Sequence, residues 1–345
     1  MEPLEWSPEG GSHLLLGGNG AGKTSLLEAI YFLATTRSFR TKHPADCIRH
    51  GAQSFEVTGE VEGQQRVSLV AGWSEGKRVR SVNGKTTTLG EHLAVLPVVS
   101  WATGDTEILT GSPQLRRRLL DRGILGIRPS SYEVLERFRQ ALAAKRQILS
   151  RFESEPNGEL SSWNGVLAGA AAELIELRRD FVERLKREVE EVRGRVGLPV
   201  PKLSFTYRPS PSSGFEGAEE IFRSFEKIAD RERRRGAPLL GPQRDDLEIR
   251  WDGREIRTTA SAGERKILSL VLVAALARTL TAVGREPVHL LDDADAELSA
   301  ATLAAVWKVF APATQLFATS SRPQVWLTLE TRRVWQVEKG RISEL

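Results

Sequence analysis

The sequence contains almost no cysteine, and this excludes a fold held together by disulfide bonds. Cys47 is the only cysteine in 345 residues, a usage that suits the reducing cytosol. No stretch reaches the roughly 18 uncharged apolar residues that a membrane-spanning helix needs. The first residues also lack the charged-then-apolar layout of a signal peptide. We therefore expect a cytoplasmic protein with no membrane contact.

An excess of charge of one sign is nearly absent as well. The chain carries 49 Lys and Arg against 45 Asp and Glu, a net charge of +4, which permits nucleic-acid binding without requiring it. Two local clusters are basic: Arg116, Arg117 and Arg118 form one, and Arg231, Arg233, Arg234 and Arg235 form the other. Each fits either a solvated helix face or a contact with nucleic-acid phosphates, and the sequence leaves both alternatives open.

A glycine-rich stretch near the N-terminus is the first positive signal. Residues 17–24 read GGNGAGKT and fit the phosphate-binding pattern G-x-x-x-x-G-K-[ST]. The apolar run 14–16 predicts a buried strand before it, and residues 24–30 predict a helix after it. Loop N–H groups and the helix dipole then favour a polyphosphate, with Lys23 on the β- and γ-phosphates and Thr24 on Mg²⁺. The residues expected to contact the nucleotide are Gly17, Asn19, Gly20, Gly22, Lys23, Thr24 and Ser25.

A second stretch, far along the chain, supplies the carboxylates that such a site needs. Residues 289–293 read HLLDD, which predicts a buried strand ending in two aspartates. At the carboxyl edge of an open α/β sheet, Asp292 is expected to hold Mg²⁺ through water, and Asp293 to orient the attacking water. His289, inside the strand, is expected to be a packed core residue. Together with residues 17–24, this stretch predicts an ATP site.

A third stretch opens an apolar helix. Ser261 and Glu264 have the spacing of a capping box. Residues 267–276 are apolar almost all round, which predicts a buried helix. Taken alone, this stretch favours a well-capped core helix.

These stretches, with the blocks between them, resemble the RecF family of ABC/SMC-type ATPases. The family-specific blocks are Arg37–Thr41 (RSFRT), Gly111–Pro113 with Arg116–Asp121, and Gly241–Leu247 (GPQRDDL). They occur in the family's order and cover nearly the whole chain. The resemblance is to this ensemble, because the phosphate-binding loop alone is common to many NTPases.

The resemblance implies a DNA-binding recombination mediator that uses ATP as a switch. RecF-like proteins are bacterial, bind gapped double-stranded DNA, and act with the RecO and RecR mediators and, indirectly, the RecA recombinase. They dimerise head to tail around two ATP molecules. Carried over here, Ser261 and Gly263 act in trans on the nucleotide held by the partner in an ATP-dependent homodimer. Asp293 is then the catalytic residue of a weak, DNA-stimulated ATPase whose cofactors are ATP and Mg²⁺.

The sequence departs from the family pattern in three places. It reaches the phosphate-binding loop by residue 17, so the family's first strand is expected to be absent or to lie upstream of Met1. Gln243 stands where the family usually has histidine, and it can hydrogen bond but cannot titrate. Ser299 stands where the family pattern has an aspartate that helps couple the two active sites. We therefore expect slow or altered ATP turnover.

The predicted fold class is α/β: a P-loop ABC-type ATPase head with a mixed sheet, split by an inserted α-helical lobe. Residues 1–111 form the first half of the ATPase lobe, with antiparallel strands from Phe55 to about Val99. Helical periodicity marks residues 112–238 as the inserted lobe. Residues 239–345 form the second half, with the signature helix and the Asp-Asp strand. No sustained heptad pattern occurs, which separates this chain from SMC proteins and their long coiled coils.

Two other functions fit parts of the sequence. An ABC-type ATPase subunit of a membrane transporter would share the nucleotide site. Its insertion is short, however, and a histidine follows its Asp pair at the next strand, whereas residues 316–321 here end in hydroxyls. A related ATP-dependent nuclease would need further metal ligands, and no such cluster stands out. The DNA-binding mediator is the leading prediction.

Overall fold

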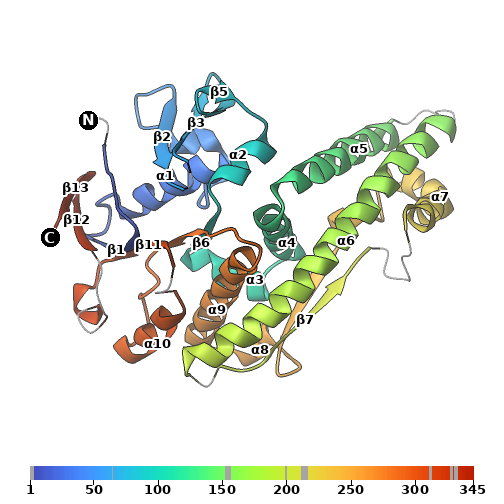
Figure 1. Ribbon diagram of the computed structural model, residues 1–345. Helices are drawn as coiled ribbons and strands as arrows, with labels where there is room; N and C mark the ends of the chain where they lie inside the picture. Colours follow the sequence, from blue (N-terminus) through green and yellow to red (C-terminus); the bar gives the residue numbers. More distant parts are fainter. Residues whose placement is uncertain are drawn as a thin grey trace.

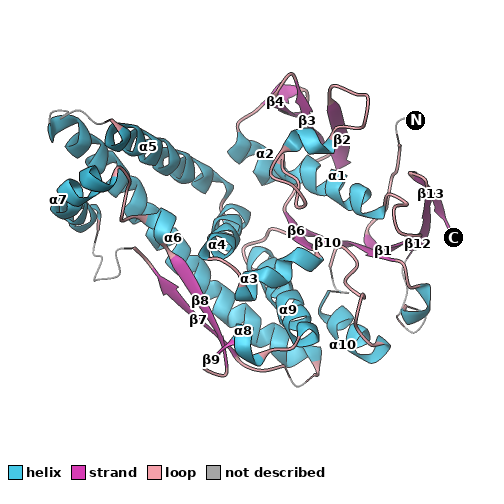
Figure 2. Cartoon of the chain, turned by 180° about the vertical axis from the view of Figure 1, so that it is seen from behind, coloured by secondary structure: helices cyan, strands magenta, loops and turns pink. Residues whose placement is uncertain are grey.

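The computed structural model describes residues 4–63, 65–151, 157–198, 200–210, 217–310, 313–326, 329 and 333–345. These residues form three sheets and a long helical arm (Figure 1). The arm extends away from the end of the molecule at which the two larger sheets and both chain termini lie (Figures 1 and 2). The predicted α/β fold with a mixed sheet is confirmed.

The largest sheet combines strands from both ends of the chain, in the order β13-β12-β1-β11-β10-β6. Its strands are β1 (Gly11–Leu16), β6 (Val98–Trp101), β10 (Val288–Leu291), β11 (Gln315–Ser320), β12 (Arg333–Glu338) and β13 (Arg341–Glu344). Every pairing between these strands is parallel except that of β12 with β13. The parallel strands therefore end at one edge, where the segments that follow β1 and β10 meet although they are far apart in the chain.

Helices cover both faces of this sheet. They are α1 (Lys23–Thr35), α9 (Ala262–Thr281) and α10 (Ala300–Phe310). Leu15 and Leu290 are buried in the cluster that contains α1, whereas Leu14 and Leu291 are buried in the cluster that contains α9 and α10. Successive residues of a strand point to opposite faces, so each apolar run supplies both layers of the core. This is why the runs are continuous rather than alternating.

A four-stranded antiparallel sheet, in the order β2-β3-β4-β5, packs against α1. Its elements and the helix that follows are β2 (Phe55–Val61), β3 (Val67–Ser74), β4 (Lys77–Val82), β5 (Lys85–Thr86) and α2 (Leu89–Val95). The prediction of antiparallel strands from Phe55 to about Val99 is therefore correct only as far as Thr86. Thr88 and Glu91 form a capping box that starts α2, and β6 then enters the large sheet in parallel.

Helices dominate the middle of the chain. They are α3 (Glu107–Thr110), α4 (Pro113–Ile127), α5 (Tyr132–Ser150), α6 (Asn157–Val196) and α7 (Ala218–Arg235). The 40-residue α6 is about 60 Å long and forms the spine of this region. It packs against α5 and α7 near its start and against α9 toward its end (Figures 1 and 2).

One strand lies within residues 112–238, the predicted α-helical lobe. β7 (Leu203–Arg208) pairs antiparallel with β8 (Asp246–Trp251), which continues to β9 (Arg254–Glu255). Buried Leu203 and Phe205 alternate with exposed neighbours, the period-2 pattern of a strand with one face in the core. The predicted boundaries at 111/112 and 238/239 stay predictions.

The remaining helical elements are short. They are η1 (Pro44–Cys47), η2 (Thr103–Thr106), η3 (Pro129–Ser131), η4 (Pro242–Arg244), α8 (Ile256–Thr259) and η5 (Pro323–Val325). Within the described ranges, no helix combines the length and the apolar character needed to cross a bilayer.

The contact between α4 and α6 tests the packing of this core. A Cβ on Gly123 would lie 2.1 Å from the ring of Phe181, which is buried. We expect Gly123→Ala to lower the free energy of unfolding by about 1–3 kcal/mol, because the ring has to move within a packed interior.

The measurement is urea unfolding followed by circular dichroism. Gly165→Ala on α6 is the matched control, since an added Cβ there meets nothing within 4 Å and alanine favours a helix. A Gly123→Ala protein as stable as the control would contradict this packing.

Candidate nucleotide-binding site

The glycine-rich loop joins β1 to α1 in conformations that favour glycine. Gly20 and Gly22 have φ angles of 79° and 108°, in the left-handed region that strains other residues. Gly17 lies so close to β12 that a Cβ would be 2.3 Å from the Val337 carbonyl oxygen. Two other predicted contact residues, Asn19 in the loop and Ser25 in the first turn of α1, are exposed.

Lys23 is held inside this loop. Its side chain is buried, and its Nζ donates hydrogen bonds to the carbonyl oxygens of Gly17 at 2.8 Å and Gly18 at 3.1 Å. Its position at the first turn of α1 adds the positive end of the helix dipole to the ammonium charge. The loop therefore presents a fixed cation and a helix N-terminus at one point, which is the chemistry that binds a polyphosphate.

Asp292 comes directly after β10 and meets the loop. The Thr24 hydroxyl donates to Asp292 Oδ1 at 2.9 Å, although 268 positions separate the two residues in the chain. Thr319, at the end of the intervening strand β11, donates to the same oxygen at 2.8 Å. The structure thus brings the two predicted motifs together and adds a residue that the sequence analysis missed.

Asp293 has a strained backbone and an unpaired carboxylate oxygen. Its φ is 48°, and its amide donates to the Thr319 hydroxyl at 2.9 Å. Its Oδ1 is buried and has no hydrogen-bond partner among the described residues, which is unusual for a buried polar atom. Burial and, after it, the negative charge of Asp292 raise the pKa of Asp293, while Lys23 opposes the shift.

These residues fit ATP and Mg²⁺. A hydroxyl and a carboxylate within hydrogen-bond distance of each other are oxygen ligands of the kind that Mg²⁺ prefers, and Mg²⁺ keeps several waters or phosphate oxygens besides. In the part of the chain that the structure describes, no three His, Cys, Asp or Glu residues gather into an all-protein metal cage. The Asp293 Oδ1 adds a buried acceptor that the described residues leave unpaired.

Comparison with known proteins identifies the family. A family model described as the RecF/RecN/SMC N-terminal domain matches residues 2–343. The DNA replication and repair protein RecF of Anaeromyxobacter sp. (strain Fw109-5) is 35% identical over 309 residues, 86% of this chain and 82% of that protein. RecF of Moorella thermoacetica (strain ATCC 39073 / JCM 9320) is 32% identical over 351 residues, 99% of this chain and 93% of that protein. This chain belongs to the RecF family.

Solved structures agree with the family assignment. The recombination mediator protein RecF-ATP in the RecFOR pathway superposes with a TM-score of 0.88 at 25% identity, covering 99% of this chain and 93% of that one. An Smc head bound to the C-winged helix domain of ScpA superposes with a TM-score of 0.55 at 18% identity, which indicates a shared fold alone. The predicted ABC/SMC-type ATPase head is confirmed as the fold.

The RecF-type signature starts α9 with a complete capping box. Glu264 N donates to Ser261 Oγ at 3.3 Å, and Ser261 N donates to Glu264 Oε2 at 2.8 Å. Ser261 is exposed, and no described hydrogen bond joins it or Gly263 to residues 17–25. The start of α9, beside α8, also lies well apart from α1 in both views (Figures 1 and 2). Within one chain, the signature and the phosphate-binding loop are therefore separate.

Lys266, one turn into α9, links the signature helix to the Asp pair. Its side chain is buried, and its Nζ donates to the carbonyl oxygens of Asp293, at 3.3 Å, and of Ala296. Its ammonium lies 5.0 Å from the centroid of the Trp101 ring, within reach of a cation–π interaction. Sequence analysis missed this residue, because the contact depends on how α9 docks beside β10.

Ser299, the residue that departs from the family pattern, caps α10. Its hydroxyl oxygen accepts a hydrogen bond from the Thr302 amide at 3.1 Å, the usual role of an N-cap serine. The expected effect of this residue on ATP turnover stays a prediction.

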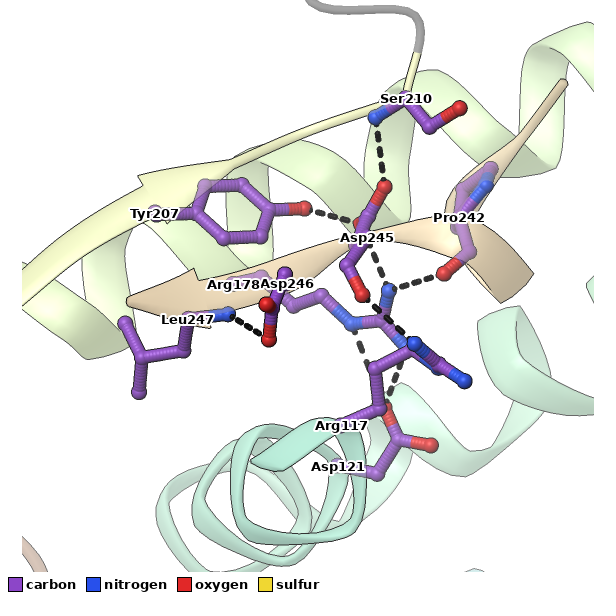
Figure 3. Close-up of polar contacts among 9 residues, drawn as sticks. All are labelled: Arg117, Asp121, Arg178, Tyr207, Ser210, Pro242, Asp245, Asp246 and Leu247. Carbon is purple, nitrogen blue, oxygen red and sulfur yellow. Dashed lines mark hydrogen bonds and ion pairs between the residues drawn. The ribbon is translucent and has the colours of Figure 1, made fainter. Parts of the chain in front are cut away.

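Residues of the Gly241–Leu247 block form one internal network with Arg178 and with Arg117 of the first arginine cluster (Figure 3). Buried Arg178 of α6 donates to Asp245 Oδ2 and Asp121 Oδ1, both at 2.7 Å. Arg116 makes a two-point contact with Asp246, at 2.7 and 3.0 Å. Such paired geometry fixes orientation, so the network joins α4 and α6 to the start of β8.

The sequence left open whether each arginine cluster is a solvated helix face or a contact with nucleic-acid phosphates, and this network bears on the first cluster. Arg117 Nη1 donates to the Asp245 carbonyl oxygen at 2.7 Å, so Arg116 and Arg117 both make intramolecular contacts, whereas both alternatives stay open for Arg118. In the second cluster, Arg233 pairs with Asp230 at 3.1 Å, whereas Arg231, Arg234 and Arg235 are exposed near the end of α7. For these three, both alternatives stay open.

Gln243, the other departure from the family pattern, lies in the same block. Its Nε2 donates to the Leu240 carbonyl oxygen at 2.7 Å, which fixes the short turn before Asp245. The role of Gln243 in ATP turnover stays a prediction.

His289 lies within β10 and is a core residue, as predicted. It is buried, its ring meets Phe310 edge-on, and burial lowers its pKa from 6.5 to about 4. Between these values the unfolded chain binds a proton that the folded chain does not, so stability falls as the pH falls through this window.

We expect proton binding by His289 to lower the free energy of unfolding by on the order of 3 kcal/mol between pH 6.5 and pH 4. The variant His289→Leu should therefore lose less stability across the window than the wild type. Urea unfolding at a series of pH values measures this, with the exposed His50→Leu as control. Equal pH dependence in His289→Leu and wild type would count against the buried neutral histidine.

Proposed function

We propose that this chain is a RecF-type recombination mediator, an ATPase that binds gapped double-stranded DNA and closes into a homodimer when ATP binds. The observation that carries the proposal is the contact between Thr24 and Asp292. It joins the phosphate-binding loop to the carboxylate strand beside an unpaired Asp293 oxygen. A site assembled in this way can bind and hydrolyse a nucleotide. Membership of the RecF family supports a role of this activity in recombination.

The residues that would hold the cofactors follow from the geometry. The N–H groups of the loop and Lys23 would bind the β- and γ-phosphates. Thr24 and Asp292 would hold Mg²⁺, directly or through water. When bound, Mg²⁺ neutralises phosphate charge and so lowers the cost of the negative charge that develops during phosphoryl transfer.

Asp293 is proposed as the residue that activates water. Its buried Oδ1 lacks a partner among the described residues and can accept a hydrogen bond from a water beside the γ-phosphate. A carboxylate whose pKa is raised by burial also accepts a proton more readily than an ordinary aspartate. Thr319 orients this residue through the Asp293 amide.

The signature is proposed to act across a dimer. Ser261 and Gly263 lie at the exposed N-terminus of a 20-residue helix, where N–H groups and the helix dipole favour an anion. Separated from their own loop, they would contact the γ-phosphate bound by the partner. ATP then stabilises the dimer because both subunits hold the same phosphate, and hydrolysis removes the bridge.

The proposed partners follow from the family. They are gapped double-stranded DNA, the RecO and RecR mediators and, indirectly, RecA. A switch needs slow turnover, so we propose a weak ATPase that DNA stimulates. Acting on chromosomal DNA, the protein would work in the cytoplasm.

The transporter alternative is less well supported. A transporter subunit would carry a histidine at the strand that follows its Asp pair, whereas residues 316–321 of this chain end in hydroxyls, and the relatives of this chain are DNA replication and repair proteins. A nuclease would need metal ligands beyond the nucleotide site, and the described residues contain no further cluster of this kind.

Removing the loop cation tests the nucleotide site. We expect Lys23→Met to lose ATP binding by at least about 100-fold, because a buried phosphate counter-charge contributes several kcal/mol, and to lose ATP-dependent retention on gapped DNA. Titration with a fluorescent ATP analogue measures binding, and a filter assay measures retention.

The control is Lys42→Met, which removes an exposed lysine of the same charge. Wild-type ATP affinity in Lys23→Met would remove the site assignment. Normal ATP binding by the wild type with no ATP-dependent DNA retention would instead remove the proposed mediator function.

A further inference from the structure

A positively charged hollow lies between the four-stranded sheet and the start of the helical arm. Its volume is about 500 Å³. Its walls come from four separate segments: the residues that follow α1, the β3–β4 hairpin, the start of α2, and the first half of α5. α5 begins beside α2 (Figures 1 and 2). The hollow is therefore a junction between two parts of the fold, at a distance from the nucleotide loop.

Cations dominate the charged groups in its lining. They are Arg37, Lys77, Arg78, Arg80 and Arg139. Glu136 is the only carboxylate among the lining residues that the structure describes, and it is already engaged. It accepts a hydrogen bond from the Tyr132 hydroxyl at 3.1 Å and lies 3.9 Å from Arg139. The lining thus carries a large excess of positive charge.

Arg37 has no counter-charge among the described residues. Its guanidinium makes no hydrogen bond or ion pair with any of them, and it remains accessible to solvent. Partial desolvation by the surrounding protein lowers the pKa of Arg37 most, and the positive charges of Arg139 and Arg78 lower it further. Cations gathered in this way repel one another, and a bound anion would relieve the repulsion.

Two further arginines are fixed in place with part of each guanidinium left over. Arg78 Nε donates to the Thr36 carbonyl oxygen at 3.0 Å, and Arg80 Nε donates to the Thr87 carbonyl oxygen at 2.8 Å. Arg78 also lies 5.8 Å from the centroid of the Trp73 ring. Each side chain is held by Nε, and the described hydrogen bonds do not use its terminal nitrogens. Pre-oriented guanidinium forks match the geometry of a phosphate group.

We infer that this hollow binds phosphates of a DNA backbone. The identity of the anion rests on the proposed function, because DNA is the polyphosphate that such a mediator binds besides ATP. The nucleotide already has its own loop at the opposite end of α1, and the hollow has no comparable glycine-rich turn among its described lining residues. Arg37 belongs to the RSFRT block, which is one of the family-specific blocks. The nucleotide site described above uses no residue of this block.

DNA bound in the hollow would contact several parts of the fold at once. DNA phosphate held here would bridge the β3–β4 hairpin and α5, and would fix the helical arm relative to the sheet layer. It would also bind next to the last turn of α1, whose first turn carries Lys23 and Thr24. ATP and DNA would then contact opposite ends of one 13-residue helix.

The test is DNA affinity as a function of salt. Fluorescence anisotropy with labelled gapped duplex, in the presence of ATP and Mg²⁺, should give a plot of log K against log salt. For the double variant Arg37→Gln/Arg139→Gln, we expect weaker binding on every sequence and a slope smaller by about 2, close to 1 for each DNA phosphate that is no longer neutralised. Arg37→Lys, which keeps the charge, should retain most of the slope.

The matched control is Arg66→Gln/Arg184→Gln. It removes the same charge from two surface arginines that pair with nearby glutamates and an aspartate. It should lower the slope by much less than the hollow variant. ATP affinity, measured on the same proteins, should be unchanged in both.

The other outcomes separate the possibilities. If the wild type binds DNA and the hollow variant has the same affinity and slope, the hollow does not bind DNA, and the proposed function stands. If the hollow variant loses ATP affinity instead, the site takes a free nucleotide and the inference is wrong. If the wild type binds no DNA with or without ATP, the proposed function and this inference fall together.

Discussion

The hydrogen bond between Thr24 and Asp292 is the contact on which the candidate site depends. It exists only because β1, β11 and β10 are parallel neighbours, so that the residues after β1 and after β10 emerge at one edge. Thr319, at the end of the middle strand, connects both aspartates to that edge. A sheet with another strand order would leave a glycine loop and a carboxylate pair with no common ligand.

The sequence predicted those parts of the site that lie within one short contiguous segment. The loop and the Asp pair could be found because strand, turn and helix signals surround each of them. Thr319 and Lys266 could not, because their roles come from strand order and from the docking of α9. The runs of arginine also did not indicate their contacts, because the partners of Arg116 and Arg117 lie about 130 positions away in the chain. The capping box at Thr88 was readable in the sequence, yet alternation in the preceding strands obscured it.

The same contacts connect distant parts of the molecule. Lys266 joins the signature helix to the segment that carries Asp293, and Arg178 joins α6 to the start of β8, which leads on to that helix. At the other side of the sheet, α1 runs from the phosphate-binding loop to the cationic hollow. Packed elements therefore connect the nucleotide site both to the proposed partner surface and to the proposed DNA contact.

The most direct test of the account is the molar mass of Asp293→Asn protein in solution, measured by light scattering with and without ATP and Mg²⁺. Blocking hydrolysis should preserve the ATP-bound state, so the account predicts a monomer that doubles in mass only with ATP. Adding Ser261→Arg should prevent the doubling while ATP still binds. A mass that ATP does not change, or a Ser261→Arg protein that dimerises equally well, would contradict a signature acting in trans.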